Sequence, residues 1–256
     1  MILYARALLL RNCGRFTHVS SDFGSQYHTH VFVTSEALYA SLTRGVTWRH
    51  EGRFIDLDAD ATKSASDDYF FCDYDVSKRL IWFTPGIFVD RELHPLAKER
   101  KVVDKNDFNV VDEDYPSTGG GGRAYYVPTY GRIESILPGH RLFACAFSPQ
   151  QAELERFTVS QTFMLGKKRT MMQIESLSDI SAGQQVKGVC ITPYLQIPPA
   201  GVGQFSRFEV LAATARYVLI RGELREPAAY WRFQGMSIDG AQYEICLPEF
   251  YIQGRL

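Results

Sequence analysis

Three consecutive cations, Lys167, Lys168 and Arg169, stand between two apolar runs with the pattern of β strands in "QTFMLGKKRTMMQIESL". Gly166 can supply the positive φ that tight hairpin turns use, so we expect a hairpin tip here. Cations at such a tip are either a solvated turn or contacts to the phosphates of a nucleic acid. A P-loop is excluded, because that pattern requires a glycine where Gln161 stands and Ser or Thr where Lys168 stands.

Other residues offer less specific chemistry. Gly119 to Gly122 could cradle a phosphate through backbone N–H groups, but no strand precedes them and no helix pattern follows, which favours a flexible hinge. His28 and His30 in "QYHTH" would supply two metal ligands at best, too few for a site. Serines and acids are plentiful, yet none falls in a nucleophile elbow. We therefore expect no catalytic residue, no metal site and no cofactor.

The composition limits the class of protein. The chain has 256 residues, 45% of them hydrophobic, which indicates one globular domain with an ordinary core. Because 28 Lys and Arg face 29 Asp and Glu, no global positive field exists, and an anion-binding surface must be a local patch. The cysteines are odd in number, scattered and without a C-x-x-C pair, which favours buried thiols in a reducing compartment: Cys13, Cys72, Cys145, Cys190 and Cys246.

The sequence also predicts a location. No window approaches the roughly 20 apolar residues that cross a bilayer. Arg6 lies inside the first apolar run and no A-x-A-like site follows it, which is unlike a signal peptide. We expect a soluble cytoplasmic protein without membrane contact.

The elements that must position these residues are mostly strands. Residues 2–10 predict a central strand buried on both faces. A short helix is expected to begin after Thr34 as N-cap and to stop at Gly45. Short strands follow, rich in Phe, Tyr, Ile and Val, and residues 94–126 form a polar, glycine-ending arm that we expect to be mobile. The pattern predicts an α+β domain of split-βαβ character with a large β extension, and a pure β barrel or sandwich is the alternative.

Three stretches, taken in order, resemble one known family. "DFGSQYHTHVFVTSEALYASL" is similar to its first loop and helix, and "YGRIESILPGHRLFACAFSP" followed by "RFTVSQTFMLGKKRTMMQIESL" resembles its signature region. In that region a "YGR" turn precedes a strand, and a strand ending in "LGK" turns into another strand. The family is the Cas-five-type subunit of the type I-D CRISPR interference complex (Cascade), a ribonucleoprotein complex of antiviral defence.

The resemblance implies an RNA-recognition-motif-like (ferredoxin-like) core with an extended, largely β arm or thumb, residues 1–256 forming a single RNA-binding domain. It implies a non-catalytic subunit that binds the 5′ handle of the CRISPR RNA and caps the filament of the repeating backbone subunit. The large subunit and the target DNA near its flanking motif would lie beside it. Expected RNA contacts follow from the cationic turn and the matched segments: Lys167, Lys168 and Arg169 at phosphates, with Tyr27, His28, His140 and Arg141 as further candidates.

Two other functions remain open. A metal-independent endoribonuclease of the same superfamily would process precursor CRISPR RNA with a Tyr, His or Lys as general acid or base. A purely structural assembly protein would contact other subunits and no RNA.

Overall fold

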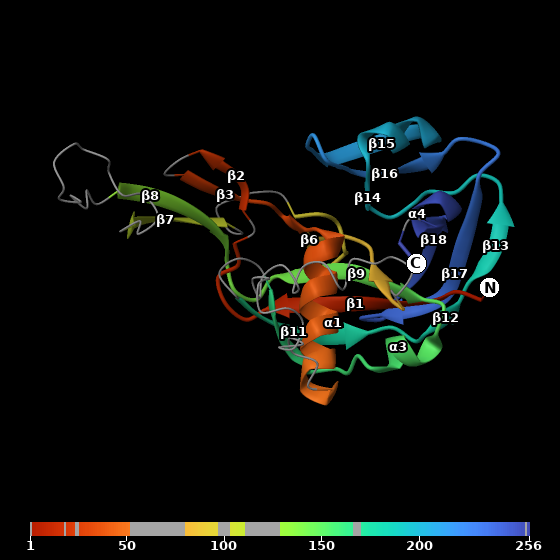
Figure 1. Ribbon diagram of the computed structural model, residues 1–256, viewed down its shortest axis with the longest axis horizontal. Helices are drawn as coiled ribbons and strands as arrows, with labels where there is room; N and C mark the ends of the chain where they lie inside the picture. Colours follow the sequence, from red (N-terminus) through yellow and green to blue (C-terminus); the bar gives the residue numbers. More distant parts are fainter. Residues whose placement is uncertain are drawn as a thin grey trace, which may run out of the picture.

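The computed structural model in Figure 1 describes residues 2–17, 19–23, 26–51, 80–96, 103–110, 129–165, 170–253 and 255–256. Strands dominate these residues and helices are few, so the protein belongs to a mixed, mostly β, α+β class. This confirms the expected class at that level.

A central antiparallel sheet organises the chain. Its strands run in the order β10-β11-β1-β9-β6-β4, with the bounds Thr162–Leu165, Thr170–Leu177, Tyr4–Asn12, Arg141–Ser148, Gly86–Val89 and Phe32–Val33. Two short strands extend it, because β5 (Trp82–Phe83) pairs with β9 and β12 (Ser181–Ala182) pairs with β1. Strand β1 lies between β11 and β9 and is buried on both faces, as the sequence predicts, although it begins and ends two residues later than expected.

Two helices cover one face of this sheet. Helix α1 (Ser35–Glu51) crosses the sheet in Figure 1, and α3 (Gln151–Glu155) lies in the connection from β9 to β10. Leu38 and Leu154 of these helices belong to one buried cluster with Leu8 and Ile174 of the sheet. The predicted N-cap is confirmed, because Thr34 Oγ1 accepts a hydrogen bond from Ala37 N at 3.3 Å. The predicted stop at Gly45 is wrong, since the helix continues to Glu51.

Arg6 explains why a cation interrupts the first apolar run. It alternates with Leu8 and therefore points to the helix-covered face of β1. Its guanidinium donates to the carbonyl oxygens of Leu154 at 2.9 Å, Phe157 at 3.1 Å and Ser178 at 2.9 Å. Arg6 thus ties the C-terminal end of α3 to the sheet, and burial lowers the pKa of the guanidinium from its ordinary value.

Strands of the C-terminal third cover the opposite face. They form two three-stranded sheets, β13-β17-β18 and β14-β16-β15, with the bounds Gln184–Lys187, Ala229–Ile238, Ala241–Pro248, Leu195–Ile197, Val218–Leu224 and Phe205–Ala213. A 3-10 helix (Pro199–Gln204) precedes β15, and α4 (Glu249–Gln253) follows β18. Ala5 and Phe147 of the central sheet lie in one buried cluster with Tyr230 and Leu247, so the central sheet has packed layers on both sides.

A fourth sheet projects away from this body (Figure 1). Its strand order is β2-β3-β8-β7, with the bounds Val19–Phe23, Gln26–Thr29, Thr129–Ile136 and Val103–Val110. Phe16 joins it to the end of β1 by exchanging backbone hydrogen bonds with Ile136, at 2.9 and 2.7 Å. Strand β7 lies within the predicted arm 94–126 and pairs with β8 along its whole length. The predicted glycine hinge at 119–122 lies outside the described residues, and the mobility of the arm stays a prediction.

Candidate nucleic-acid interface

The two strands of the predicted hairpin are present, one before and one after the cationic turn. Strands β10 and β11 are antiparallel, and their last facing residues are Leu165 and Thr170, both buried. The four residues between them, Gly166 with Lys167, Lys168 and Arg169, lie outside the described residues. Because a buried pair closes the hairpin, the connection begins and ends at one fixed end of the central sheet.

His140 and Arg141 lie at this same end. Asn12, the last residue of β1, donates its backbone N–H to the carbonyl of His140 at 3.1 Å. The Cα partners of Arg11 are Arg141 on β9 and Gln173 on β11. The register therefore brings together two of the predicted segments, although about 25 residues of chain separate them.

The segment after β1 connects these two pieces, and the sequence analysis missed it. Asn12 Nδ2 donates to the carbonyls of Gly14 at 3.0 Å and Leu137 at 2.8 Å. Cys13 N donates to Met171 O at 2.9 Å. Thr170 Oγ1 donates to Arg15 O at 2.7 Å. The "NCGR" sequence could have indicated this turn, because Asn and Gly at the end of an apolar run favour a turn and the Asn side chain can bond to nearby backbone groups.

The two arginines in this part of the sheet each have a carboxylate partner. Arg11 donates to Glu175 through Nε at 2.8 Å and Nη2 at 2.7 Å, which raises the pKa of Arg11. A β-bulge explains the contact, because Leu9 pairs with Ser176 and Leu10 with Ile174, leaving Glu175 as the additional residue of β11.

Arg141 is held in a similar way. Its Nη1 bonds to the Asp239 carboxylate in the β17–β18 turn, and its Nη2 donates to Asp90 O at 3.2 Å. Asp239 therefore occupies a donor that a phosphate would otherwise use at Arg141. The structure therefore gives Arg141 a role in joining three segments, and its predicted RNA contact stays a prediction.

Two exposed methionines flank the cationic turn. Met164 on β10 and Met171 on β11 are Cα partners, with 55% and 44% of their surfaces exposed. Their neighbours Phe163, Leu165 and Met172 point to the helix-covered cluster, so the two methionines lie on the opposite face, as Arg11 does. An apolar strip thus adjoins the turn that carries the three cations.

Tyr27 and His28 lie elsewhere. Both are on β3, in the projecting sheet, where Tyr27 is the partner of Asp22 on β2 and of Ile133 on β8. The structure does not describe the positions of their side chains. Of the four predicted RNA contacts within the described residues, His140 and Arg141 therefore lie at the end of the central sheet, and Tyr27 and His28 lie in the projecting sheet.

Among the described residues, no group of three His, Cys, Asp or Glu side chains has the arrangement of a metal site. Within the same ranges, no helix is both long and apolar enough to cross a membrane.

Comparison with known proteins adds no relative: no protein-family model matches the chain, and no curated protein is significantly similar to it in sequence.

Proposed function

We propose that this chain is a non-catalytic, RNA-binding subunit of a type I-D CRISPR surveillance complex. In this proposal it binds the 5′ handle of the CRISPR RNA, caps the filament of backbone subunits beside the large subunit, and supports target DNA recognition. The observation that carries the proposal is the meeting of the cationic hairpin with the His140–Arg141 segment at one end of the central sheet.

The strand order supports an RNA-recognition-motif-like core. A ferredoxin-like βαββαβ unit places its fourth, first, third and second strands side by side in an antiparallel sheet. Here β11, β1, β9 and β6 are neighbours in that order. Helix α1 lies between β1 and β6 along the chain, and α3 lies between β9 and β11. All three pairings in this row are antiparallel.

The layers on this core favour binding at its end. RNA-recognition motifs commonly stack bases on the sheet face opposite the helices. In this chain that face packs against the C-terminal strands, because Ala5 and Phe147 are buried against Tyr230 and Leu247. Bases therefore have no open sheet face over the covered part of β1 and β9, and an RNA strand would run across the exposed hairpin end of that face and the segment after β1.

The exposed surface at this end suits single-stranded RNA. A kinked single strand needs cations at its phosphates and apolar surface for its splayed bases. We assign the phosphate contacts to Lys167, Lys168 and Arg169, and the base contacts to the strip of Met164 and Met171. Arg11 and Arg141 orient this end through Glu175 and Asp239.

The projecting sheet supports the second half of the proposal. A sheet that extends beyond the body presents strand edges to a neighbouring subunit, and β2 and β7 are the outer strands of its four-stranded path. We assign this sheet to the contact with the first backbone subunit. Tyr27 and His28 on β3 then belong to the zone where the RNA and that neighbour meet.

Salt dependence tests the phosphate assignment. The assay is fluorescence anisotropy with a labelled handle RNA over a series of KCl concentrations. Each phosphate contact to a single strand contributes about −0.7 to the slope of log affinity against log salt. Replacing Lys167, Lys168 and Arg169 with Ala should flatten the slope by about 2.

A charge-matched variant controls for non-specific attraction. Arg156, Lys187 and Arg216 are exposed and lie outside the proposed interface, and replacing them with Ala removes the same charge. Their triple variant should keep the slope of the unmodified protein. Equal flattening in both variants, or in neither, would refute the assignment.

Two further measurements separate the alternative functions. Incubation of the protein with repeat RNA in EDTA should leave the RNA intact, whereas a metal-independent endoribonuclease gives discrete fragments. Ultraviolet crosslinking in the assembled complex should link the guide RNA to the tryptic peptides that flank residues 166–169. A protein that crosslinks only to other subunits would be an assembly factor, and the RNA proposal would be wrong.

A further inference from the structure

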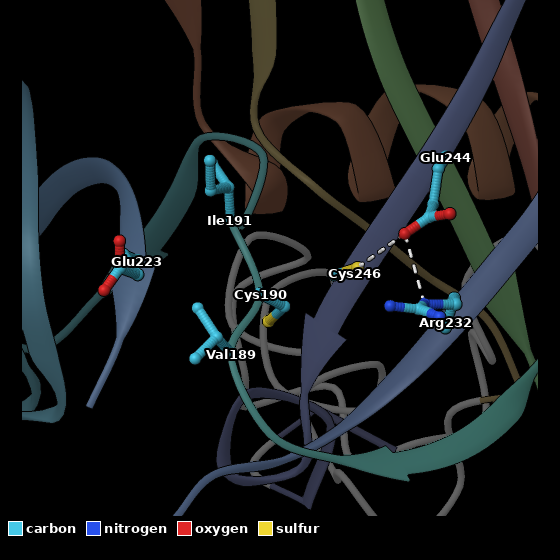
Figure 2. A pocket seen from close by; sticks show the side chains of 7 residues that line it. All are labelled: Val189, Cys190, Ile191, Glu223, Arg232, Glu244 and Cys246. Atoms are coloured by element: carbon cyan, nitrogen blue, oxygen red, sulfur yellow. Dashed lines mark hydrogen bonds and ion pairs between the residues drawn. The ribbon is translucent and has the colours of Figure 1, made fainter. Parts of the chain in front are cut away.

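A cavity of about 340 Å³ lies among the C-terminal strands (Figure 2). One wall is the connection from β13 to β14, which carries Val189, Cys190 and Ile191, and the other is formed by β16, β17 and β18. Val189 and Ile191 are 51% and 62% exposed, so this wall is open to solvent. The remaining lining residues are polar or contain sulfur: Glu223, Arg232, Glu244 and Cys246.

The two cysteines of this cavity interact with each other. Both thiols are free, and both residues belong to the same buried cluster although they are distant in sequence. A hydrogen bond between their side chains is the largest cause of a raised pKa at Cys190 and a lowered pKa at Cys246. This interaction favours a proton on Cys190 and loss of the proton from Cys246.

Charged groups surround the Cys246 sulfur. The Cys246 thiol donates a hydrogen bond to Glu244 Oε1 at 3.7 Å, and Arg232 Nε lies 3.1 Å from the same oxygen. This Arg232–Glu244 contact is an ion pair without hydrogen-bond alignment, because the buried Nε has no hydrogen-bond partner. Glu244 disfavours a thiolate at Cys246 and Arg232 favours it. A negatively charged ligand that enters the cavity would therefore meet the Arg232 guanidinium there.

We propose that Cys190 and Cys246 form a redox-active dithiol site whose co-substrate is a low-molecular-weight, carboxylate-bearing disulfide such as glutathione disulfide. The Cys246 thiolate attacks one sulfur of that disulfide, and its S–S bond breaks to release one thiolate. Cys190 then loses its proton and attacks Cys246 Sγ, which expels the second thiolate. The chain loses two hydrogens and two electrons to form a Cys190–Cys246 disulfide, and the small disulfide gains them as two thiols.

The other described cysteines lack this arrangement. Cys145 is fully buried, and burial raises the pKa of its thiol to about 12. Cys13 is exposed and its nearest polar contact is the carbonyl of Arg11 at 3.9 Å. Cytoplasmic disulfides are usually transient and redox-sensing, which is the use that this pair permits.

Peptide mapping after exposure to glutathione disulfide tests the proposal. The full-length reduced protein is incubated with glutathione disulfide, quenched in acid, alkylated and digested with trypsin. We expect the peptides 188–207 and 233–255, which carry the two cysteines, to be recovered as one disulfide-linked species. Reduction should separate them again.

Single variants identify the order of attack. Cys190→Ser should leave a stable glutathione adduct on peptide 233–255, because no second thiol resolves it. Cys246→Ser should give an adduct on neither peptide at the same exposure. Cys13→Ser is the matched control and should form the Cys190–Cys246 link at an unchanged rate.

A measurement on the unmodified protein does not depend on whether the variants fold. Alkylation of peptide 233–255 by iodoacetamide should reach half its maximal rate at a lower pH than alkylation of free glutathione. If Cys13 acquires glutathione while peptides 188–207 and 233–255 stay unlinked, the dithiol proposal is wrong. The proposal is also wrong if peptide 233–255 reaches half its maximal alkylation rate at the same pH as glutathione or at a higher pH.

Discussion

Replacing Arg6 with Met is expected to lower the free energy of unfolding by about 2 to 3 kcal/mol. Methionine keeps an apolar stem against the helix-covered cluster but removes the guanidinium donor from the carbonyls of Phe157, Ser178 and Leu154. The Leu154 carbonyl then keeps a long bond from Phe157 N at 3.5 Å. Each acceptor left unpaired in a buried site costs about 1 kcal/mol, and water that reaches part of this site reduces the sum. For a chain of this size the expected decrease in Tm is roughly 4 to 12 °C.

Urea unfolding followed by far-ultraviolet circular dichroism measures the effect. The matched control is Arg156→Met at the end of α3, because the Arg156 side chain is half exposed and forms an ion pair with Glu153 at 3.2 Å. Exposed pairs contribute about 0 to 1 kcal/mol, so this variant should remain close to the unmodified protein. Equal stability of the Arg6 and Arg156 variants would refute the assignment of Arg6 as the tie between α3 and the sheet.

Three further predictions use other parts of the fold. Gly222→Ala should lower the free energy of unfolding by about 1 to 3 kcal/mol, because a Cβ there would lie 2.2 Å from the backbone oxygen of Arg207. Gly203→Ala is its control, since a Cβ there has no atom within 4 Å, and equal urea midpoints of the two variants would contradict the prediction. Burial raises the pKa of Tyr251 to about 12, so as the pH rises the unfolded state loses the phenolic proton before the folded state does. Stability should therefore decrease between pH of about 10 and 12, and Tyr251→Phe should weaken that decrease in pH-dependent thermal melts. Asn12→Ala should cost about 1 to 2 kcal/mol and also reduce handle RNA affinity, since two carbonyls at the proposed interface lose their donor; unchanged anisotropy with reduced stability would separate Asn12 from the interface.

Local patterns predicted the central sheet well. The run at residues 2–10 is apolar at nearly every position, which is typical of a strand covered on both faces, and β1 is such a strand. The apolar run after the cationic turn was predicted as a strand, and residues 170–177 form β11 there. The start of α1 followed from Thr34, because an N-cap is a local hydrogen bond.

Patterns failed where tertiary contacts decide the backbone. Residues 156–165 predict one strand, yet β10 covers only residues 162–165, because Arg6 bonds the chain at Phe157 and Ser160 has a positive φ of 69°. Gly45 does not end α1, since a glycine costs only about 1 kcal/mol inside a helix and the chain continues past it. Strands β17 and β18 were not predicted, although their hairpin supplies Asp239 to Arg141.

The candidate interface could be predicted only in part. Charge spacing pointed to the turn at 167–169, but the register that brings Arg141 beside Arg11 depends on pairing across more than a hundred residues. The carboxylate partners of both arginines were also invisible in sequence, because Glu175 reaches Arg11 through a bulge. The Cys190–Cys246 pair was taken as two isolated thiols, since no spacing rule joins cysteines so far apart.

The position of β1 in the middle of the central sheet has a consequence for synthesis. Its neighbours β9 and β11 begin at Arg141 and Thr170, more than a hundred residues after β1 ends at Asn12. A ribosome adds about 5 to 20 residues per second, so the strand emerges and remains without either partner for on the order of ten seconds. During that interval a nine-residue segment that is largely apolar and has open edges is available to chaperones or to other nascent chains. A chain truncated before Arg141 therefore carries β1 without β9 and β11, the two strands that flank it.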